Sequence, residues 1–88
     1  MSRDNDSHED RYRVFSRIAP IIMDFYGNHA GEAFHAEDLR RHVLWLDPGI
    51  APDSPGRILR ELRLRGWLNY VVINRRQSLY QFRSLGNG

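Results

Sequence analysis

The residues of this chain best suited to binding chemistry are arginines that gather in its C-terminal third. Residues 54–88 contain seven arginines and one acid, Glu61, which gives the segment a net charge of +6. Each guanidinium presents a planar fork of N–H donors that fits phosphate oxygens and the edge of guanine. This excess of cations predicts a polyanionic partner. The chain has no lysine, and a GC-rich genome that favours arginine codons would explain that at least as well as function does.

Charge in the rest of the chain is of the opposite sign. Residues 1–10 sum to −3 and residues 11–53 to −1, so the whole chain carries only +2. A total this small is low for a dedicated nucleic-acid-binding protein, which leaves a protein partner open. The separation of the charges along the chain, rather than their sum, is what points to a polyanion.

No catalytic constellation is visible. The chain has no cysteine, which excludes thiol nucleophiles and cysteine-containing zinc sites. Phosphate-binding glycine loops and nucleophile-elbow motifs are absent. His29 precedes a helix face on which His35, Asp38 and His42 recur at spacings of three and four, but no metalloenzyme spacing such as HExxH is present. The sequence therefore predicts no enzyme, no cofactor and no bound metal.

Hydrophobic periodicity predicts the elements that position the arginines. Apolar residues at helical spacing predict a first helix over 11–29, with a kink or a new start near Pro20 and an end near Asn28. A second helix is expected over 35–46, although His35 occupies a position where serine or threonine would cap better. Asp53, Ser54 and Pro55 mark the start of a third helix over 54–65, which Gly66 ends.

Two strands are expected after the third helix, over 67–73 and 79–83, joined by a polar turn at 74–78. Glu32, Ala33 and Phe34 form a further short extended segment. The fold class is therefore α+β, with a disordered acidic leader at 1–10, one domain at 11–85 and a flexible tail at 86–88. Expected core residues are Phe34, Leu39, Val43, Leu46, Ile58, Leu59, Leu62, Leu68, Tyr70, Tyr80 and Phe82, with Trp45 and Trp67 as packing residues.

This order of elements, with these residues, resembles the winged helix-turn-helix family of DNA-binding domains. The resemblance covers residues 11–85. It rests on FHAEDLRRHV as the first helix of the helix-turn-helix, SPGRILRELRLRGWL as the recognition helix and NYVVINRRQSLYQF as the wing. The connection at 47–53 is longer and richer in proline than a tight helix-turn-helix turn.

The resemblance implies a small prokaryotic or phage transcriptional regulator that binds double-stranded DNA in the cytoplasm. The helix at 54–65 would enter the major groove, and the wing at 73–78 would contact the backbone or the minor groove. The residues expected to contact DNA are Ser54, Gly56, Arg57, Arg60, Arg63, Arg75, Arg76 and Arg41.

Other partners are considered beside DNA. A winged helix can also serve as a protein–protein adaptor module, and a homodimer is left open, with Leu64 and Trp67 as candidate contacts. No apolar run is long enough to cross a membrane, so no membrane partner is expected.

Overall fold

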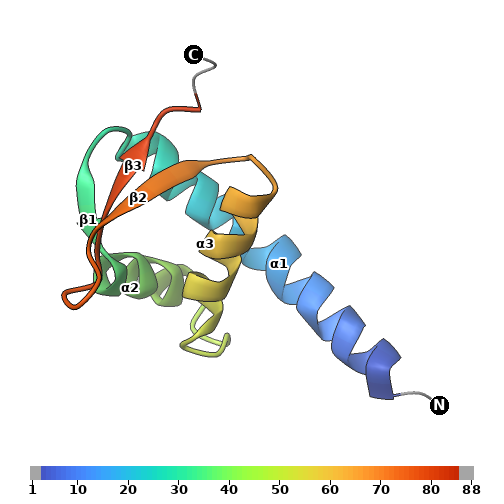
Figure 1. Cartoon of the computed structure of the whole chain (residues 1–88). Helices are drawn as coiled ribbons and strands as arrows, with labels where there is room; N and C mark the ends of the chain where they lie inside the picture. The colour runs from blue at the N-terminus through green and yellow to red at the C-terminus, as the bar shows by residue number, and fades with distance from the viewer. Residues whose placement is uncertain (1–2, 86–88) are drawn as a thin grey trace.

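Three helices and a small antiparallel sheet make up the protein (Figure 1). The computed structural model describes the backbone of residues 3–85 and the side chains of residues 12–85. The elements, in chain order, are α1 (Arg3–Asn28), β1 (Ala33–His35), α2 (Ala36–Leu46), α3 (Ser54–Leu64), β2 (Asn69–Asn74) and β3 (Leu79–Arg83). The predicted α+β class is confirmed.

The first helix is longer than its hydrophobic pattern indicates. It begins at Arg3 and passes through Pro20 to Asn28, so no new helix starts at the proline. The structure has residues 3–10, part of the leader predicted to be disordered, as the first turns of α1. These residues contain no glycine or proline, and a polar segment can extend an existing helix because elongation needs no new nucleus. The tail predicted at 86–88 lies outside the described residues.

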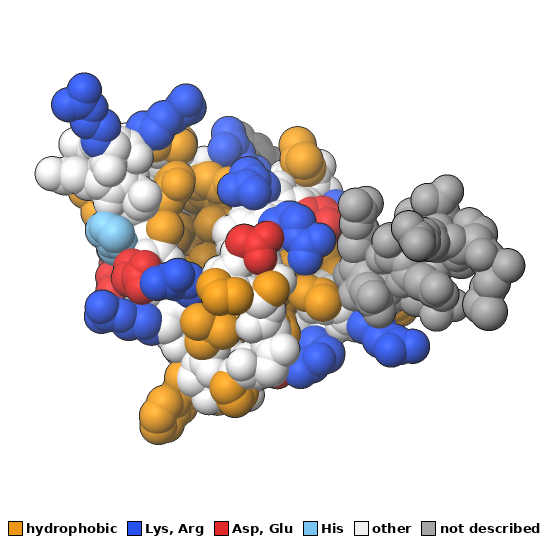
Figure 2. All heavy atoms as spheres, turned by 90° about the horizontal axis from the view of Figure 1, so that it is seen from below, with side chains coloured by type: hydrophobic (Ala, Val, Ile, Leu, Met, Phe, Trp, Pro, Cys, Tyr) orange, Lys and Arg blue, Asp and Glu red, His pale blue; other side chains and the backbone are white. Residues whose placement is uncertain are grey.

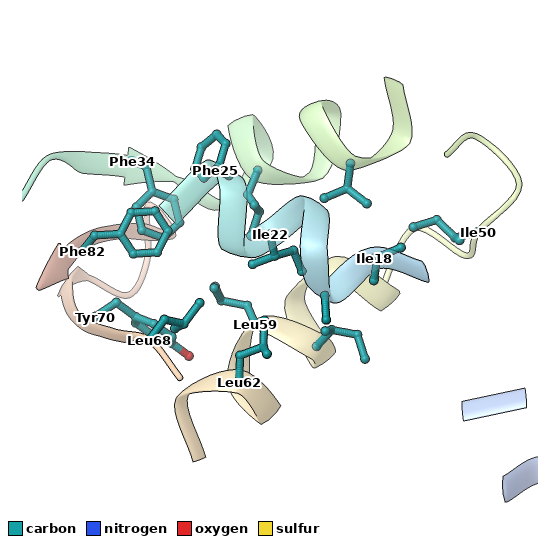
Figure 3. Close-up of a cluster of buried hydrophobic side chains, with 14 residues drawn as sticks. Ile18, Ile22, Phe25, Phe34, Ile50, Leu59, Leu62, Leu68, Tyr70 and Phe82 are labelled. Atoms are coloured by element: carbon teal, nitrogen blue, oxygen red, sulfur yellow. The ribbon is translucent and has the colours of Figure 1, made fainter. Parts of the chain in front are cut away.

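Pro20 is tolerated because packing on the other face of α1 holds the helix together. The Pro20 ring is exposed, whereas Ile18, Ile22 and Phe25 are buried against α2, α3 and the sheet (Figure 3). A proline inside a helix costs about 3 kcal/mol. Burial of three large apolar side chains contributes about 1.5–3 kcal/mol each and offsets that cost.

Helix α2 is capped by an unusual residue. Nδ1 of His35 accepts a hydrogen bond from the backbone N–H of Glu37, 3.0 Å away. His35 thus performs the capping role expected of serine or threonine. Two acids, Glu37 and Asp38, follow in the first turn and suit the positive end of the helix.

The two ends of α3 differ in how their backbone groups are capped. At the start, Asp53 makes no side-chain capping bond, contrary to the expected cap, and both Ser54 and Pro55 are buried. At the end, Gly66 has φ +80°. The N–H of Gly66 donates to the carbonyl of Arg63 and the N–H of Trp67 donates to that of Leu62, each over 3.0 Å. This pair of bonds is a Schellman motif, which requires a left-handed residue at the position of Gly66.

The sheet has the order β1-β3-β2, with both pairs antiparallel. An extra residue in β2, between Val72 and Asn74, breaks the register next to the turn. Phe34 of β1 stacks on Phe82 of β3, with ring centroids 4.1 Å apart, and Phe25 of α1 meets both rings edge-on (Figure 3).

Most of the expected core is buried. The buried members are Phe34, Leu39, Val43, Ile58, Leu59, Leu62, Leu68, Tyr70 and Phe82, and Tyr80 packs against them partly buried. Two expectations were wrong, because Trp45 is 83% exposed and Leu46 is 54% exposed. Both lie in the last turn of α2, after Val43, the last buried residue of this helix. Trp67 is 46% exposed and contacts the ring of Phe15 edge-on.

Substitution by alanine should have opposite effects on stability at Gly66 and at Gly27. An added Cβ would meet nothing within 4 Å at either position, so backbone conformation alone decides. Gly66→Ala should cost about 1–2 kcal/mol of unfolding free energy because its φ is left-handed. Gly27→Ala, inside α1, should instead add up to about 1 kcal/mol. Urea denaturation of both variants measures this, and equal effects would contradict the assigned conformations.

Candidate nucleic-acid interface

A groove of about 390 Å³ lies between α3, the start of α2 and the sheet. Leu39, Leu59 and Tyr70 are among the residues that line its apolar part, and Arg60, Arg63 and Arg75 line it as cations. No acid lines the groove. Figure 2 shows this side of the molecule, with arginine side chains on both sides of a hollow that has hydrophobic side chains at its base.

One wall of the groove is formed by a stripe of residues on α3. Gly56, Arg60 and Arg63 are separated by four and three residues, so they form a single stripe along α3. Gly56 has no side chain to fill the space next to Arg60. An added Cβ there would lie 3.8 Å from Nη1 of Arg60, at ordinary contact distance.

Arg63 is held over the sheet by an aromatic ring. Its guanidinium carbon lies 4.8 Å from the centroid of Tyr70, a cation–π geometry. Tyr70 is buried and meets Tyr80 edge-on at 5.5 Å. The ring under Arg63 therefore has a fixed place, and the cation above it is oriented before any ligand arrives.

The opposite wall comes from the β2–β3 turn, which is bonded to the start of α2. Within the turn, the N–H of Ser78 donates to the carbonyl of Arg75 at 3.2 Å, and the N–H of Gln77 donates to Oδ1 of Asn74 at 3.1 Å. The N–H of Ala36 then donates to the carbonyl of Ser78 at 2.9 Å. These bonds fix Arg75 relative to the rest of the groove.

The arginines in and beside the groove lack the acidic partners that several other arginines have. Among the described side chains, Arg17 pairs with Asp47, Arg40 and Arg41 pair with Glu37, and Arg65 pairs with Glu61. Within residues 12–85, no acid pairs with Arg60, Arg63, Arg75 or Arg76. Cations without protein counterions are the ones free to neutralise phosphate.

Arg41 is exposed on α2 and only weakly held. Its Nε lies 4.0 Å from Oε2 of Glu37, which also receives a hydrogen bond from Arg40. The hydrogen bond from Arg40 lowers the pKa of Glu37, and the charges of Arg40 and Arg41 lower it further, whereas partial burial acts in the opposite direction. Glu37 therefore stays ionised near neutral pH and offsets part of the positive charge beside the groove.

Two of the expected contact residues do not have the required geometry. Ser54 is 1% exposed, so its hydroxyl cannot reach a phosphate, and its N–H already donates to the carbonyl of Ala51. Arg57 is half-buried, with Nη2 3.4 Å from Oγ of Ser54 and Nε buried without a partner. Arg57 lies about 100° around the helix from Gly56, and it is not part of the groove wall.

The structure brings together Gly56, Arg60, Arg63 and Arg75 in one groove and leaves Arg76 exposed at the adjoining turn. Sequence reasoning missed the aromatic and aliphatic lining. Tyr70, Val72 and Tyr80 alternate with outward-facing positions in their strands, and this alternation was the signal available for them.

Other chemistry finds little support in the described part of the chain. No three or more His, Asp or Glu side chains of residues 12–85 are grouped so that they could hold a metal ion. None of the helices there combines the length and hydropathy that crossing a bilayer requires. A comparison of the chain with protein-family models, curated proteins and solved structures found no match.

The lowered pKa of Glu37 predicts a specific response to mutation. Arg40→Ala removes its hydrogen-bond donor, so the pKa of Glu37 should rise towards the ordinary value of 4.5. A carboxyl with a lowered pKa stabilises the fold above its ordinary pKa, and this contribution is lost as pH falls through the lowered pKa. An NMR titration of the Glu37 carboxyl in the unchanged protein and in Arg40→Ala measures this rise in pKa. An unchanged midpoint would contradict the pairing.

Proposed function

We propose that this protein binds double-stranded DNA through α3 and the β2–β3 turn, as a small winged-helix transcriptional regulator. The observation that carries the proposal is the groove between these elements, where Arg60, Arg63 and Arg75 converge without an acidic partner. A duplex presents a dense row of phosphates, and unpaired arginines on a shared surface are what a protein needs to neutralise them.

The arrangement of elements supports the winged helix-turn-helix interpretation. Helices α2 and α3 follow one another, and a β-hairpin follows α3, with β1 completing an antiparallel sheet at the outer edge of β3. The hairpin turn lies beside the N-terminal part of α2 rather than apart from the helices (Figure 1). A recognition helix and a wing would thus meet the same duplex.

The dimensions suit such a complex. Helix α3 has 11 residues, which corresponds to a length of about 16 Å at 1.5 Å per residue. The major groove of B-DNA is about 12 Å wide and admits one helix. With α3 in that groove, Arg60 would face base edges, Arg63 would contact base or phosphate, and Arg75 and Arg76 would contact the flanking backbone or minor groove. Arg41 would add a phosphate contact from α2.

Single alanine substitutions test this assignment. Arg60→Ala should cost about 1–3 kcal/mol of binding free energy if the side chain contacts a base, because that contact is specific. Arg75→Ala and Arg76→Ala should each weaken binding and reduce the salt slope of log K by about 1, as expected for loss of one phosphate contact. Fluorescence anisotropy with duplex DNA over a salt series measures both quantities.

The matched control is Arg83→Ala. Arg83 is exposed at the end of β3 remote from the turn, and it does not line the groove. The control removes the same charge and should change DNA affinity much less. Equal losses in Arg60→Ala and Arg83→Ala would show a non-specific charge effect. Absence of DNA binding by the unchanged protein would instead favour the adaptor function.

Glu37→Gln should strengthen DNA binding. The substitution removes the negative charge that pairs with Arg40 and Arg41 next to the groove, so both cations become available to phosphate and the salt slope becomes steeper. The same anisotropy titration measures the change. Asp24→Gln is a suitable control, because Asp24 is exposed on α1 and does not line the groove. Weaker binding by Glu37→Gln would contradict the placement of α2 beside DNA.

A further inference from the structure

The groove between α3, the start of α2 and the sheet, here called the arginine groove, has an apolar base that a DNA duplex does not use. Val72 of β2 and Tyr80 of β3 lie opposite each other in the sheet and both line this base. Val72 is 40% exposed. The bases of a duplex are stacked and present only their edges, and taking one out costs its stacking and pairing. Contacts with a duplex would therefore involve the arginines and leave the apolar base of the groove uncovered.

A buried tyrosine hydroxyl in the same groove lacks a partner. Tyr70 lines the groove and is only 4% exposed, yet within residues 12–85 its hydroxyl makes no hydrogen bond. Buried tyrosine hydroxyls usually find a partner, as that of Tyr26 does in the carbonyl of Arg83. The oxygen of Tyr70 is not fully enclosed, and Figure 3 shows it on the side of β2 that faces α3. A ligand in the groove can supply the missing partner.

The charges of the groove favour a phosphate group over a carboxylate. Arg60, Arg63 and Arg75 line the groove and no acid does. A carboxylate carries one negative charge, whereas a phosphate monoester carries about 1.5 to 2 at pH 7 and offers three acceptor oxygens. The planar fork of each guanidinium matches such oxygens. Three unpaired arginines above an apolar base therefore fit a flat ring that bears a phosphate.

The extent of the groove favours a single nucleotide over a strand. Its volume of about 390 Å³ lies within the range of about 300–1,000 Å³ that is usual for small-molecule sites. An adjoining hollow shares Ala36, Gly56 and Arg60 with the groove, but Glu37 and Asp53 also line that hollow. The phosphates of a strand that continued in this direction would meet two acids. A single nucleotide stays among the arginines.

We propose that the arginine groove is a binding site for a free nucleoside monophosphate. The phosphate pairs with the three arginines, the base lies against Val72 and Tyr80, and a nitrogen or oxygen of the base is hydrogen-bonded to the hydroxyl of Tyr70. The nucleotide and DNA would need the same arginines, so the nucleotide would displace DNA. That consequence rests on the proposed function, whereas nucleotide binding itself does not.

The first test is a titration of the full chain, without DNA, with adenosine, guanosine, cytidine and uridine 5′-monophosphates. Isothermal titration calorimetry gives the affinities, and NMR chemical shifts locate the site. At least one monophosphate should bind more tightly than both inorganic phosphate and its own nucleoside, because only the monophosphate uses the arginines and the apolar base together. Absence of binding by all four overturns the proposal, as does an equal affinity for inorganic phosphate.

Tyr70→Phe separates nucleotide binding from DNA binding. The variant keeps the ring under Arg63 and removes a hydroxyl that has no protein partner, so its urea stability should match that of the unchanged protein. Nucleotide affinity should fall about two- to tenfold, as expected for the loss of one hydrogen bond. The affinity for duplex DNA should not change. The matched control is Tyr12→Phe, which removes the same group from an exposed residue outside the groove and should bind nucleotide normally.

Three further outcomes would overturn the assignment. One is an unchanged nucleotide affinity in Tyr70→Phe. Another is a single-stranded oligonucleotide that binds to the groove more tightly than every mononucleotide, which would assign the groove to a strand. The third is a nucleotide that binds without displacing a bound duplex in the anisotropy assay, which would place the two ligands on different surfaces. Failure of the protein to bind DNA would not affect the titration with nucleotide alone, so the two proposals fail separately.

Discussion

The contact on which the rest of the fold depends is the stack of Phe34 on Phe82, with Phe25 against both rings. These rings belong to β1, β3 and α1, so one aromatic cluster joins the outer strand, the middle strand and the longest helix. A chain of 88 residues has a small core, and these three rings are its aromatic contact between helix and sheet. Once β3 is fixed, β2 is aligned by its ladder and the turn between them is brought to the start of α2. The turn that forms one wall of the groove is therefore positioned by an aromatic cluster that does not itself line the groove.

Arginines serve three purposes in this small structure, and their neighbours decide which. Arg17, Arg40 and Arg41 pair with acids on or near helix ends. Arg65 orders aromatic rings and is held by a carboxylate. Arg60 and Arg75 have open surroundings next to an apolar floor. The count of charges along the sequence does not distinguish these arginines. Their contacts in the structure do, because some arginines pair within the protein and others remain available to a ligand.

The sequence predicted the elements well because their signals are local. Turn residues and periodicity placed α2, α3 and β3 within one residue of their observed ends.

The errors concern side chains whose burial or direction depends on residues distant in the sequence. Ser54 is of a residue type that usually caps a helix at the surface, but here it is buried. Trp45 is large and apolar, but its side chain is exposed. Arg57 belongs to the same helix as Arg60, yet it is half-buried beside Ser54 and does not line the groove. The length of α1 was underestimated because a polar segment continued a helix that the core had already formed.

The hydrogen bond from the N–H of Ala36 to the carbonyl of Ser78 has a mechanical consequence. It joins the hairpin tip to the first turn of α2, so the tip cannot swing independently as a free hairpin would. A ligand that contacts Arg75 or Arg76 would therefore meet a turn that is already ordered. Binding would then lose less free energy to the ordering of a loop. The turn that carries Arg75 and the start of α2 are thus joined, so the position of this wall of the groove is set before a ligand arrives.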